Sequence, residues 1–347
     1  MKGLRCLALL AVICLLSGCQ GGQEAPSLAD EGMAAVRKEH YEEALSNFSA
    51  SIGTDEDVLV SYRGMGMAYM GLEQYEKAVN AFDEAYQLTN DRMKETRRDL
   101  LFYKAAALYR QQDYSETINT CNNILDISQE ADAFYLRGAC YLELGEQEKA
   151  KANFDAAVGL SPEDYDLYLN IYECYKEEKL SAEGGAYLSG AMDIEPETPQ
   201  DYCQRARIYY ALEDYESAKK ELDALVEEKN GDALFLMGQV YLAMEDYTHS
   251  KSMYQEYIET AGETPLAYNG IVLANLAEND ADSALKNIEK GLSLEEEDGK
   301  QELLFNEIVA YEHKQDYETA KEKAEAYVEA YPSSEDGKKE YEFLKTR

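Results

Sequence analysis

A short pattern, a tyrosine followed three residues later by a small side chain, recurs along this chain at a nearly constant interval. With weaker copies included, the small residue occurs nine times, at spacings of 34, 39, 33, 34, 34, 32, 34 and 36 residues. A period of this length is typical of repeat proteins, in which one unit cannot bury its apolar face alone and therefore stacks on its neighbours. The nine small residues are Ala44, Ala78, Thr117, Ala150, Gly184, Ala218, Ser250, Ala284 and Ala320.

Other positions keep the same phase when this small residue is numbered 20 in each unit. Positions 4, 8 and 11 then share one stripe of a first helix, and positions 20, 24 and 27 share one stripe of a second. Because glycine inside a helix costs about 1 kcal/mol relative to alanine, glycine at position 8 predicts that the two helices pack closely. Position 8 is Gly32, Gly66, Ala105, Gly138, Ala206 and Gly238, with departures at Tyr172, Val272 and Ile308.

In its period and in these residues the chain resembles the tetratricopeptide repeat family between about Leu28 and Pro332. The resemblance implies an all-α fold: a right-handed superhelical solenoid of about nine helix-turn-helix units over residues 28–332. Residues 333–347 are expected to form a C-terminal capping helix, with Tyr341 and Leu344 facing inward.

The N-terminus has the features of an exported protein. Residues 1–18 begin with basic side chains, continue with an apolar run of about eleven residues and end in small residues, as secretory signal peptides do. The apolar run is shorter than the roughly 20 residues that a spanning helix needs. Leu16-Ser17-Gly18-Cys19 resembles the lipobox of bacterial lipoproteins, which implies cleavage before Cys19, lipidation of Cys19, and a short tether over residues 19–27.

Charge is strongly unbalanced, with 33 Lys and Arg against 69 Asp and Glu and a net charge of −36. Such a surface repels nucleic-acid phosphates, so no nucleic-acid partner is expected. The acidic residues either solvate exposed helix faces or favour a partner with basic character. One of the few basic clusters, Lys94, Arg97 and Arg98, lies in five extra residues near 89–98, which predict either a hinge or a longer helix.

No pattern of residues indicates catalysis. Phosphate-binding and dinucleotide-binding glycine motifs are missing from the sequence, and its three histidines lie far apart. Cys121, Cys140, Cys174 and Cys203 form no C-x-x-C pair, and Cys121 takes the place of the large position-24 residue as a small buried hydrophobe. The sequence therefore predicts a non-catalytic protein with no cofactor and no metal.

The resemblance also implies where a partner binds. In this family positions 2, 5, 9 and 12 of the first helices line a concave groove, where aromatic and arginine side chains contribute most to binding energy. The family's clamp for a C-terminal carboxylate is not expected, because Arg63 at position 5 is followed by Met67 rather than asparagine. The predicted partner-binding residues are Phe102, Tyr109, Tyr135, Leu142, Arg207, Tyr210, Phe235 and Gln239.

Two functions are compatible with these features. The first is a membrane-anchored, extracytoplasmic scaffold or adaptor that binds a protein or peptide in its groove and touches the membrane only through its lipid. Its location is then the outer face of the cell membrane, or the outer membrane of a Gram-negative cell. The alternative is a solute- or glycan-binding lipoprotein of an envelope uptake system, which is disfavoured because the chain has no Trp to serve as a binding platform.

Overall fold

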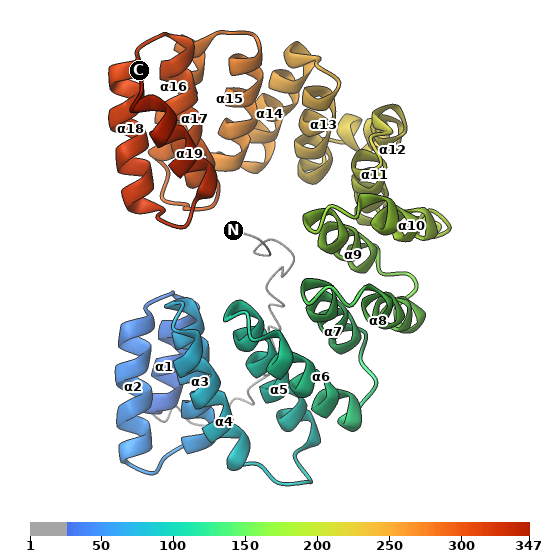
Figure 1. Ribbon diagram of the computed structural model, residues 1–347, viewed down its shortest axis with the longest axis vertical. Helices are drawn as coiled ribbons and strands as arrows, with labels where there is room; N and C mark the ends of the chain where they lie inside the picture. The colour runs from blue at the N-terminus through green and yellow to red at the C-terminus, as the bar shows by residue number, and fades with distance from the viewer. Residues whose placement is uncertain (1–25) are drawn as a thin grey trace. The chain divides into compact units, whose positions relative to one another are not determined.

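The computed structural model describes residues 26–347, and within that range the chain forms nineteen α-helices and no strand (Figure 1). The signal peptide over residues 1–18, Cys19 and most of the tether lie outside the described residues. Contacts divide the described chain into two compact units, residues 26–187 and residues 188–347, with the boundary inside α10. They are called the N-terminal unit and the C-terminal unit below.

In the N-terminal unit, each of the first four predicted repeats is a pair of successive helices, and a fifth pair begins there. The helices are α1 (Leu28–Arg37), α2 (Tyr41–Gly53), α3 (Val58–Gly71), α4 (Tyr75–Gln87), α5 (Lys94–Arg110), α6 (Tyr114–Ile127), α7 (Ala131–Glu143), α8 (Gln147–Leu160), α9 (Tyr165–Glu177) and α10 (Ser181–Ala191).

The C-terminal unit continues the same arrangement through four further pairs and a last single helix. These helices are α11 (Pro199–Ala211), α12 (Tyr215–Glu227), α13 (Gly231–Ala243), α14 (Tyr247–Ala261), α15 (Pro265–Ala277), α16 (Ala281–Leu292), α17 (Lys300–His313), α18 (Tyr317–Ala330) and α19 (Glu335–Leu344). The all-α prediction, with nine helix pairs and a capping helix, is confirmed.

The turn inside each helix pair has one conformation throughout residues 26–347. Position 15 adopts positive φ in all nine pairs, and only one of these residues is the glycine that this region favours. Two residues later, position 17 begins the second helix, often after an aspartate whose carboxylate accepts a hydrogen bond from a backbone N–H of the first turn. The positive-φ residues are Glu39, Glu73, Gln112, Gly145, Lys179, Glu213, Glu245, Asn279 and Gln315.

Close packing at position 8 is confirmed. A Cβ atom added to Gly138 would lie 2.7 Å from the Phe154 ring of the paired helix, and one added to Gly238 would lie 2.9 Å from the Tyr254 ring. Where position 8 is large, position 24 can be small: Ile308 pairs with Ala324, and both are fully buried. The combined side-chain volume of positions 8 and 24 is therefore roughly conserved, because a large residue at one position is matched by a small residue at the other. This accounts for the departure of Ile308 from the family pattern.

The five extra residues lengthen a helix. Helix α5 has 17 residues, and its first turn is tied back to α4 through Arg97. The Arg97 guanidinium lies 4.8 Å from the centre of the Tyr86 ring, its Nη2 donates to the Tyr86 hydroxyl at 2.6 Å, and its Nη1 donates to Asp91 at 2.6 Å. The sequence left a hinge and a longer helix open, and these contacts decide for the longer helix.

Helix α19 caps the last pair. Leu344 is 1% exposed and packs with Tyr327 of α18, whereas Tyr341 is half-buried against the same cluster. Gly337 brings the backbone of α19 against the Tyr327 ring, at a distance that would place an added Cβ atom 2.5 Å away. The expected inward side chains thus do face the array, and α19 covers the apolar surface that α18 would otherwise expose.

A carboxyl pair joins this cap to α17. Partial burial, together with the neighbouring Glu340 carboxylate, raises the pKa of Glu312 to about 7, against an ordinary value of 4.5. Between these two values the folded chain binds more protons than the unfolded chain, so this pair makes stability fall as pH rises from about 4.5 to 7.

Replacing Glu312 by glutamine should therefore raise the melting temperature at pH 8, and the gain should shrink towards zero as the pH falls to 5. Thermal unfolding followed by circular dichroism across this range measures it. Glu335→Gln is the matched control, because Lys338 lowers the pKa of Glu335 and the variant should gain nothing at pH 8. If Glu312→Gln raised the melting temperature equally at pH 5 and pH 8, the raised pKa of Glu312 would be contradicted.

Candidate partner-binding surface

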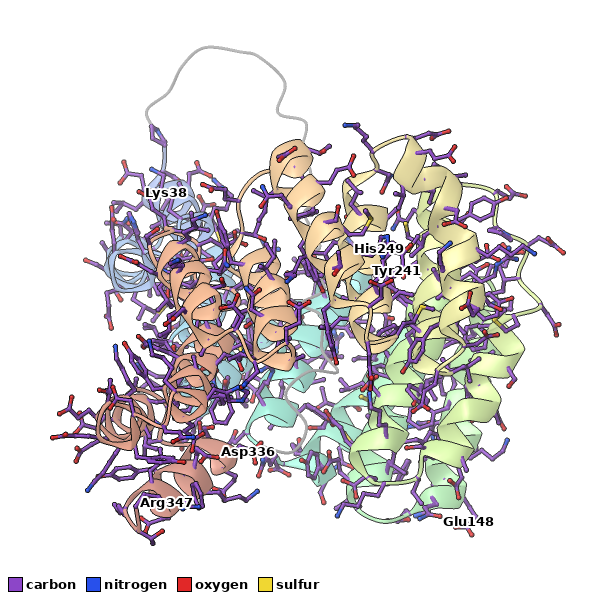
Figure 2. All side chains as sticks on the ribbon, turned by 90° about the horizontal axis from the view of Figure 1, so that it is seen from above. Lys38, Glu148, Tyr241, His249, Asp336 and Arg347 are labelled. Carbon is purple, nitrogen blue, oxygen red and sulfur yellow. The ribbon has the colours of Figure 1, made fainter. Side chains whose placement is uncertain are left out.

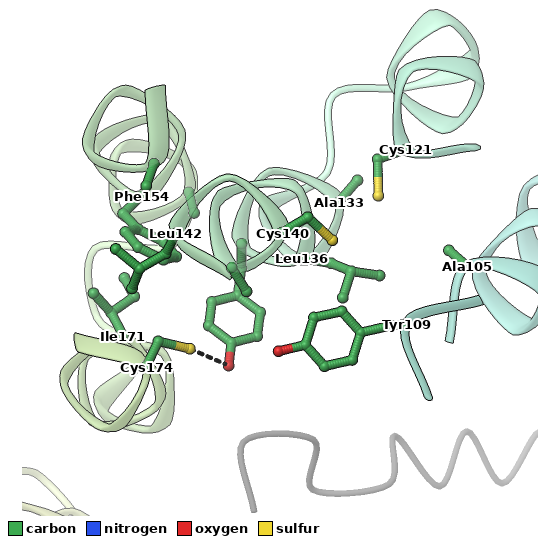
Figure 3. Close-up of a cluster of buried hydrophobic side chains, with 14 of the residues drawn as sticks. Ala105, Tyr109, Cys121, Ala133, Leu136, Cys140, Leu142, Phe154, Ile171 and Cys174 are labelled. Carbon is green, nitrogen blue, oxygen red and sulfur yellow. Dashed lines mark hydrogen bonds between the residues drawn. The ribbon is translucent and has the colours of Figure 1, made fainter. Parts of the chain in front are cut away.

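The groove positions of the N-terminal unit are more buried than the sequence predicted. Phe102 is half-buried, but Tyr109, Tyr135 and Leu142 are only 6%, 7% and 3% exposed. All three buried side chains belong to one apolar cluster that links α5, α7 and α9 (Figure 3). The expectation that these three present an exposed contact surface is corrected: their side chains lie inside the unit.

The reason for this burial is that large side chains at positions 5 and 12 fill the gaps between successive first helices. The Tyr135 hydroxyl of α7 and the Cys174 thiol of α9 lie 3.4 Å apart, and the Tyr135 ring lies 6.1 Å from the Phe154 ring. In Figure 3 the Tyr109 hydroxyl points towards the hydrogen-bonded pair of Tyr135 and Cys174. Burial, with Cys174 nearby, raises the pKa of Tyr109. Helical periodicity places these side chains on the correct face but does not say how closely the next helix approaches.

In the C-terminal unit the predicted residues reach solvent. Arg207 is exposed, and its Nη1 donates to Gln204 on the same helix at 2.7 Å. Tyr210 and Gln239 are half-buried. Phe235 is half-buried as well, with its ring 5.5 Å from that of Tyr254 and 5.3 Å from that of Tyr257. These four side chains, on α11 and α13, are at least partly exposed to solvent.

Two further residues of this kind were missed because the predicted set stopped at the seventh repeat. Leu273 at position 9 of α15 is 38% exposed. Asn269 at position 5 of α15 accepts a hydrogen bond from Asn306 of α17 at 2.7 Å. The same position rule, applied to the eighth repeat, would have found both residues. They were missed because the rule was applied only as far as the seventh repeat.

Acidic side chains stand at position 2 of several first helices. Asp132, Asp166 and Asp232 are exposed, and the Asp99 side chain is 39% exposed beside Arg98. Partial burial, with Asp164 and Glu130 nearby, raises the pKa of Asp132. Position 2 thus carries a carboxylate on each of the three successive first helices α5, α7 and α9, and such a row attracts cationic groups.

The four cysteines within residues 26–347 are buried and form no disulfide. Burial raises the pKa of Cys121 to about 12 and that of Cys203 to about 11, so both thiols stay protonated and unreactive near neutral pH. The interpretation of Cys121 as a small buried hydrophobe is confirmed, since it is fully enclosed. Within residues 26–347 no group of three or more His, Cys, Asp or Glu side chains is arranged to hold a metal ion.

His249 has a local structural role. It is exposed, its ring stacks on that of Tyr241 at 5.2 Å, and its Nδ1 lies 2.7 Å from the Asp246 carboxylate at the start of α14 (Figure 2).

The described residues include no helix long and apolar enough to cross a membrane.

The geometry defines a class of protein: an all-helical repeat protein built of stacked helix pairs. Family models of the tetratricopeptide repeat match residues 61–92, 131–164 and 203–262, all of which fall within these pairs. The fold is thus an array of tetratricopeptide-type units, as the sequence predicted.

Individual proteins show the same similarity. The chain is 26% identical to tetratricopeptide repeat protein 16 of Macaca fascicularis over 208 residues, covering 56% of this chain and 24% of that protein. It is 22% identical to the human mitochondrial import receptor subunit TOM70 over 237 residues, covering 66% of this chain and 38% of that protein. The chain therefore spans less than half the length of these two relatives.

Among solved structures, a tetratricopeptide repeat protein from Parabacteroides merdae superposes with a TM-score of 0.51 at 16% identity. The superposition covers 82% of this chain and 98% of that one. At this level of identity the likeness concerns the fold.

Proposed function

We propose that this chain is a membrane-anchored, extracytoplasmic scaffold that binds a protein or peptide partner on its first helices and catalyses nothing. The observation that carries the proposal is the set of solvent-accessible side chains at groove positions on α11 and α13, namely Arg207, Tyr210, Phe235 and Gln239. Arginine and aromatic side chains dominate the energy of protein interfaces, and here a rigid helical array presents them.

The membrane setting rests on the N-terminal residues. A signal-like segment followed by Leu16-Ser17-Gly18-Cys19 supports export and lipidation at Cys19. The similarity to TOM70 supports a receptor-like or adaptor-like role, because that relative is named as an import receptor subunit.

A partner with basic character is favoured by charge. The chain carries a net charge of −36, and the position-2 carboxylates Asp99, Asp132 and Asp166 lie on successive first helices of one unit. A cationic partner would be steered towards this surface, with an association rate that falls as salt increases.

Site-specific photo-crosslinking tests the binding surface. A photoreactive amino acid at Arg207 or Gln239 of the full-length chain, activated in the native cell, should capture the same discrete partner from both positions. The matched control is Lys220, an exposed residue on the second helix α12 of the same unit. Capture that is equal at Lys220, or absent from both groove positions, would refute the assignment.

A further inference from the structure

One arginine of the N-terminal unit has an enclosed nitrogen atom without a hydrogen-bond partner. Arg63 lies in the middle of α3, is half-buried, and its Nε is enclosed without a hydrogen bond. Arg205 of the C-terminal unit also has an enclosed Nε without a hydrogen bond, but its guanidinium is paired, because Nη2 donates to Glu221 at 2.8 Å. No residue of the range 26–347 forms a hydrogen bond or ion pair with the Arg63 side chain.

This arrangement is unfavourable for the free protein. A buried N–H without an acceptor loses its hydration and gains nothing in return, and the attached positive charge is partly desolvated as well. With Nε enclosed, the guanidinium offers its two terminal Nη groups to solvent as paired donors, the geometry that binds a carboxylate. A site of this kind is completed by an anionic group from outside.

The groove positions nearest to Arg63 are apolar. Val60, Met67 and Met70 share its stripe on α3, at spacings of three, four and seven residues. The same groove positions are Met33 and Val36 on α1 and Phe102 on α5, the first helices of the preceding and following pairs, both of which contact α3. All six side chains are half-buried, so each packs on the core with one side and faces outward with the other.

We propose that Arg63 anchors an acidic side chain within a partner segment whose neighbouring residues are apolar. The inference rests on the proposed function, and it specifies that the part of the partner that binds at Arg63 is acidic. Because apolar groove positions lie on both sides of Arg63, on α1 and on α5, a segment crossing α3 continues past the guanidinium in both directions. The acidic group is therefore an internal Asp or Glu rather than a chain end.

The charge at position 2 of the first helices supports an acidic group at Arg63. Position 2 of α3 is Val60, whereas α5, α7 and α9 carry Asp99, Asp132 and Asp166 there. Flexible methionine side chains can adapt to the apolar neighbours of the bound carboxylate. A highly anionic partner would be repelled by the net charge of −36, so a single carboxylate in an otherwise uncharged or basic segment fits best.

Arg63→Met is the variant that tests the proposal, because it keeps the length and apolar contacts of the side chain and removes the charge and the unpaired N–H. If Arg63 is a binding residue, the free full-length variant should melt about 2 °C or more above the wild type. A merely structural arginine would give the opposite result, and a lowered melting temperature would overturn the proposal.

Binding is measured by fluorescence anisotropy with labelled peptides that are blocked at both ends. One peptide carries a single glutamate between apolar residues, and its partner carries glutamine there. The wild-type chain should prefer the glutamate peptide by about tenfold or more, and Arg63→Met should show no preference. Arg92→Met, at an exposed arginine of the same unit, is the control and should keep the wild-type preference.

Two results would overturn the inference: no preference for glutamate in the wild type, or a preference for a free C-terminus over the internal glutamate. If crosslinks at Arg207 and Gln239 still capture a partner, the proposed scaffold function stands and only the role of Arg63 falls. If the wild type captures no partner at those positions and ignores both peptides, both fall.

Discussion

Replacing Gly64 by alanine is expected to destabilise the N-terminal unit by about 2 kcal/mol, although alanine is the better helix former. The Phe48 ring, fully buried at position 24 of the first repeat, lies against both Gly32 of its own pair and Gly64 of the next. A Cβ atom at Gly64 would lie well inside van der Waals contact with this ring. Because a fully buried ring has no free space to move into, the added methyl group separates α2 from α3.

The C-terminal unit offers an independent copy of the same contact. Gly270 of α15 lies against the ring of Tyr254, which also contacts Gly238, so Gly270→Ala should cost a similar amount. Gly159 is the matched control, because nothing lies within 4 Å of its added Cβ atom, and Gly159→Ala should leave stability unchanged or slightly raise it.

Urea unfolding followed by hydrogen exchange measures these effects, since a repeat array need not unfold in one step. Adding Phe48→Leu to Gly64→Ala should recover part of the loss, which a double-mutant cycle would report as coupling between the two positions. Equal stability of Gly64→Ala and Gly159→Ala would show that the ring is not held between the two glycines.

Replacing Cys19 by serine is expected to release the protein from the membrane. In the proposed anchor the acyl chains attached to Cys19 hold the protein, and each buried methylene group contributes about 0.8 kcal/mol. A single fourteen-carbon chain binds only marginally, whereas two chains hold a protein stably, so loss of the diacylglyceryl group should change the distribution almost completely.

Membrane fractionation and the mass of the N-terminal peptide measure this outcome. Cys14→Ser is the matched control, because Cys14 lies in the apolar run ahead of the proposed cleavage site and its replacement should leave anchoring intact. An unmodified Cys19 in the membrane fraction, or a Cys19→Ser variant that stays there, would refute the anchor.

Much of the candidate surface could be placed from the sequence. The position rule put Arg207, Tyr210, Phe235 and Gln239 on first helices, where they are exposed or half-buried. The same rule failed for the exposure of Tyr135, because the Cys174 thiol on the next first helix lies close enough to meet the tyrosine hydroxyl. A spacing along one helix carries no information about the distance to its neighbour.

Arg63 shows a different limit. Its position was evident from the repeat, but it was set aside because the residue after it in the family's clamp, asparagine, is replaced by Met67. What distinguishes Arg63 is that its Nε is enclosed while none of the acidic residues in the described part of the chain pairs with its guanidinium, and that depends on the placement of every neighbouring side chain. The sequence pattern alone therefore cannot show that the Arg63 side chain lacks a partner.

The sequence by itself determined the nine-unit period, the all-helical class and the close approach at position 8, because helical periodicity and side-chain volume are local properties. The tyrosine-and-small-residue pattern marks the second helix of a pair, and in most repeats its tyrosine is the first residue of that helix. Only the tertiary structure decided that the residues near 89–98 extend α5, that Tyr109 and Tyr135 are buried, and that Arg63 is unpaired. These depend on contacts between helices that lie apart in the sequence, where packing distance rather than spacing determines which side chains meet.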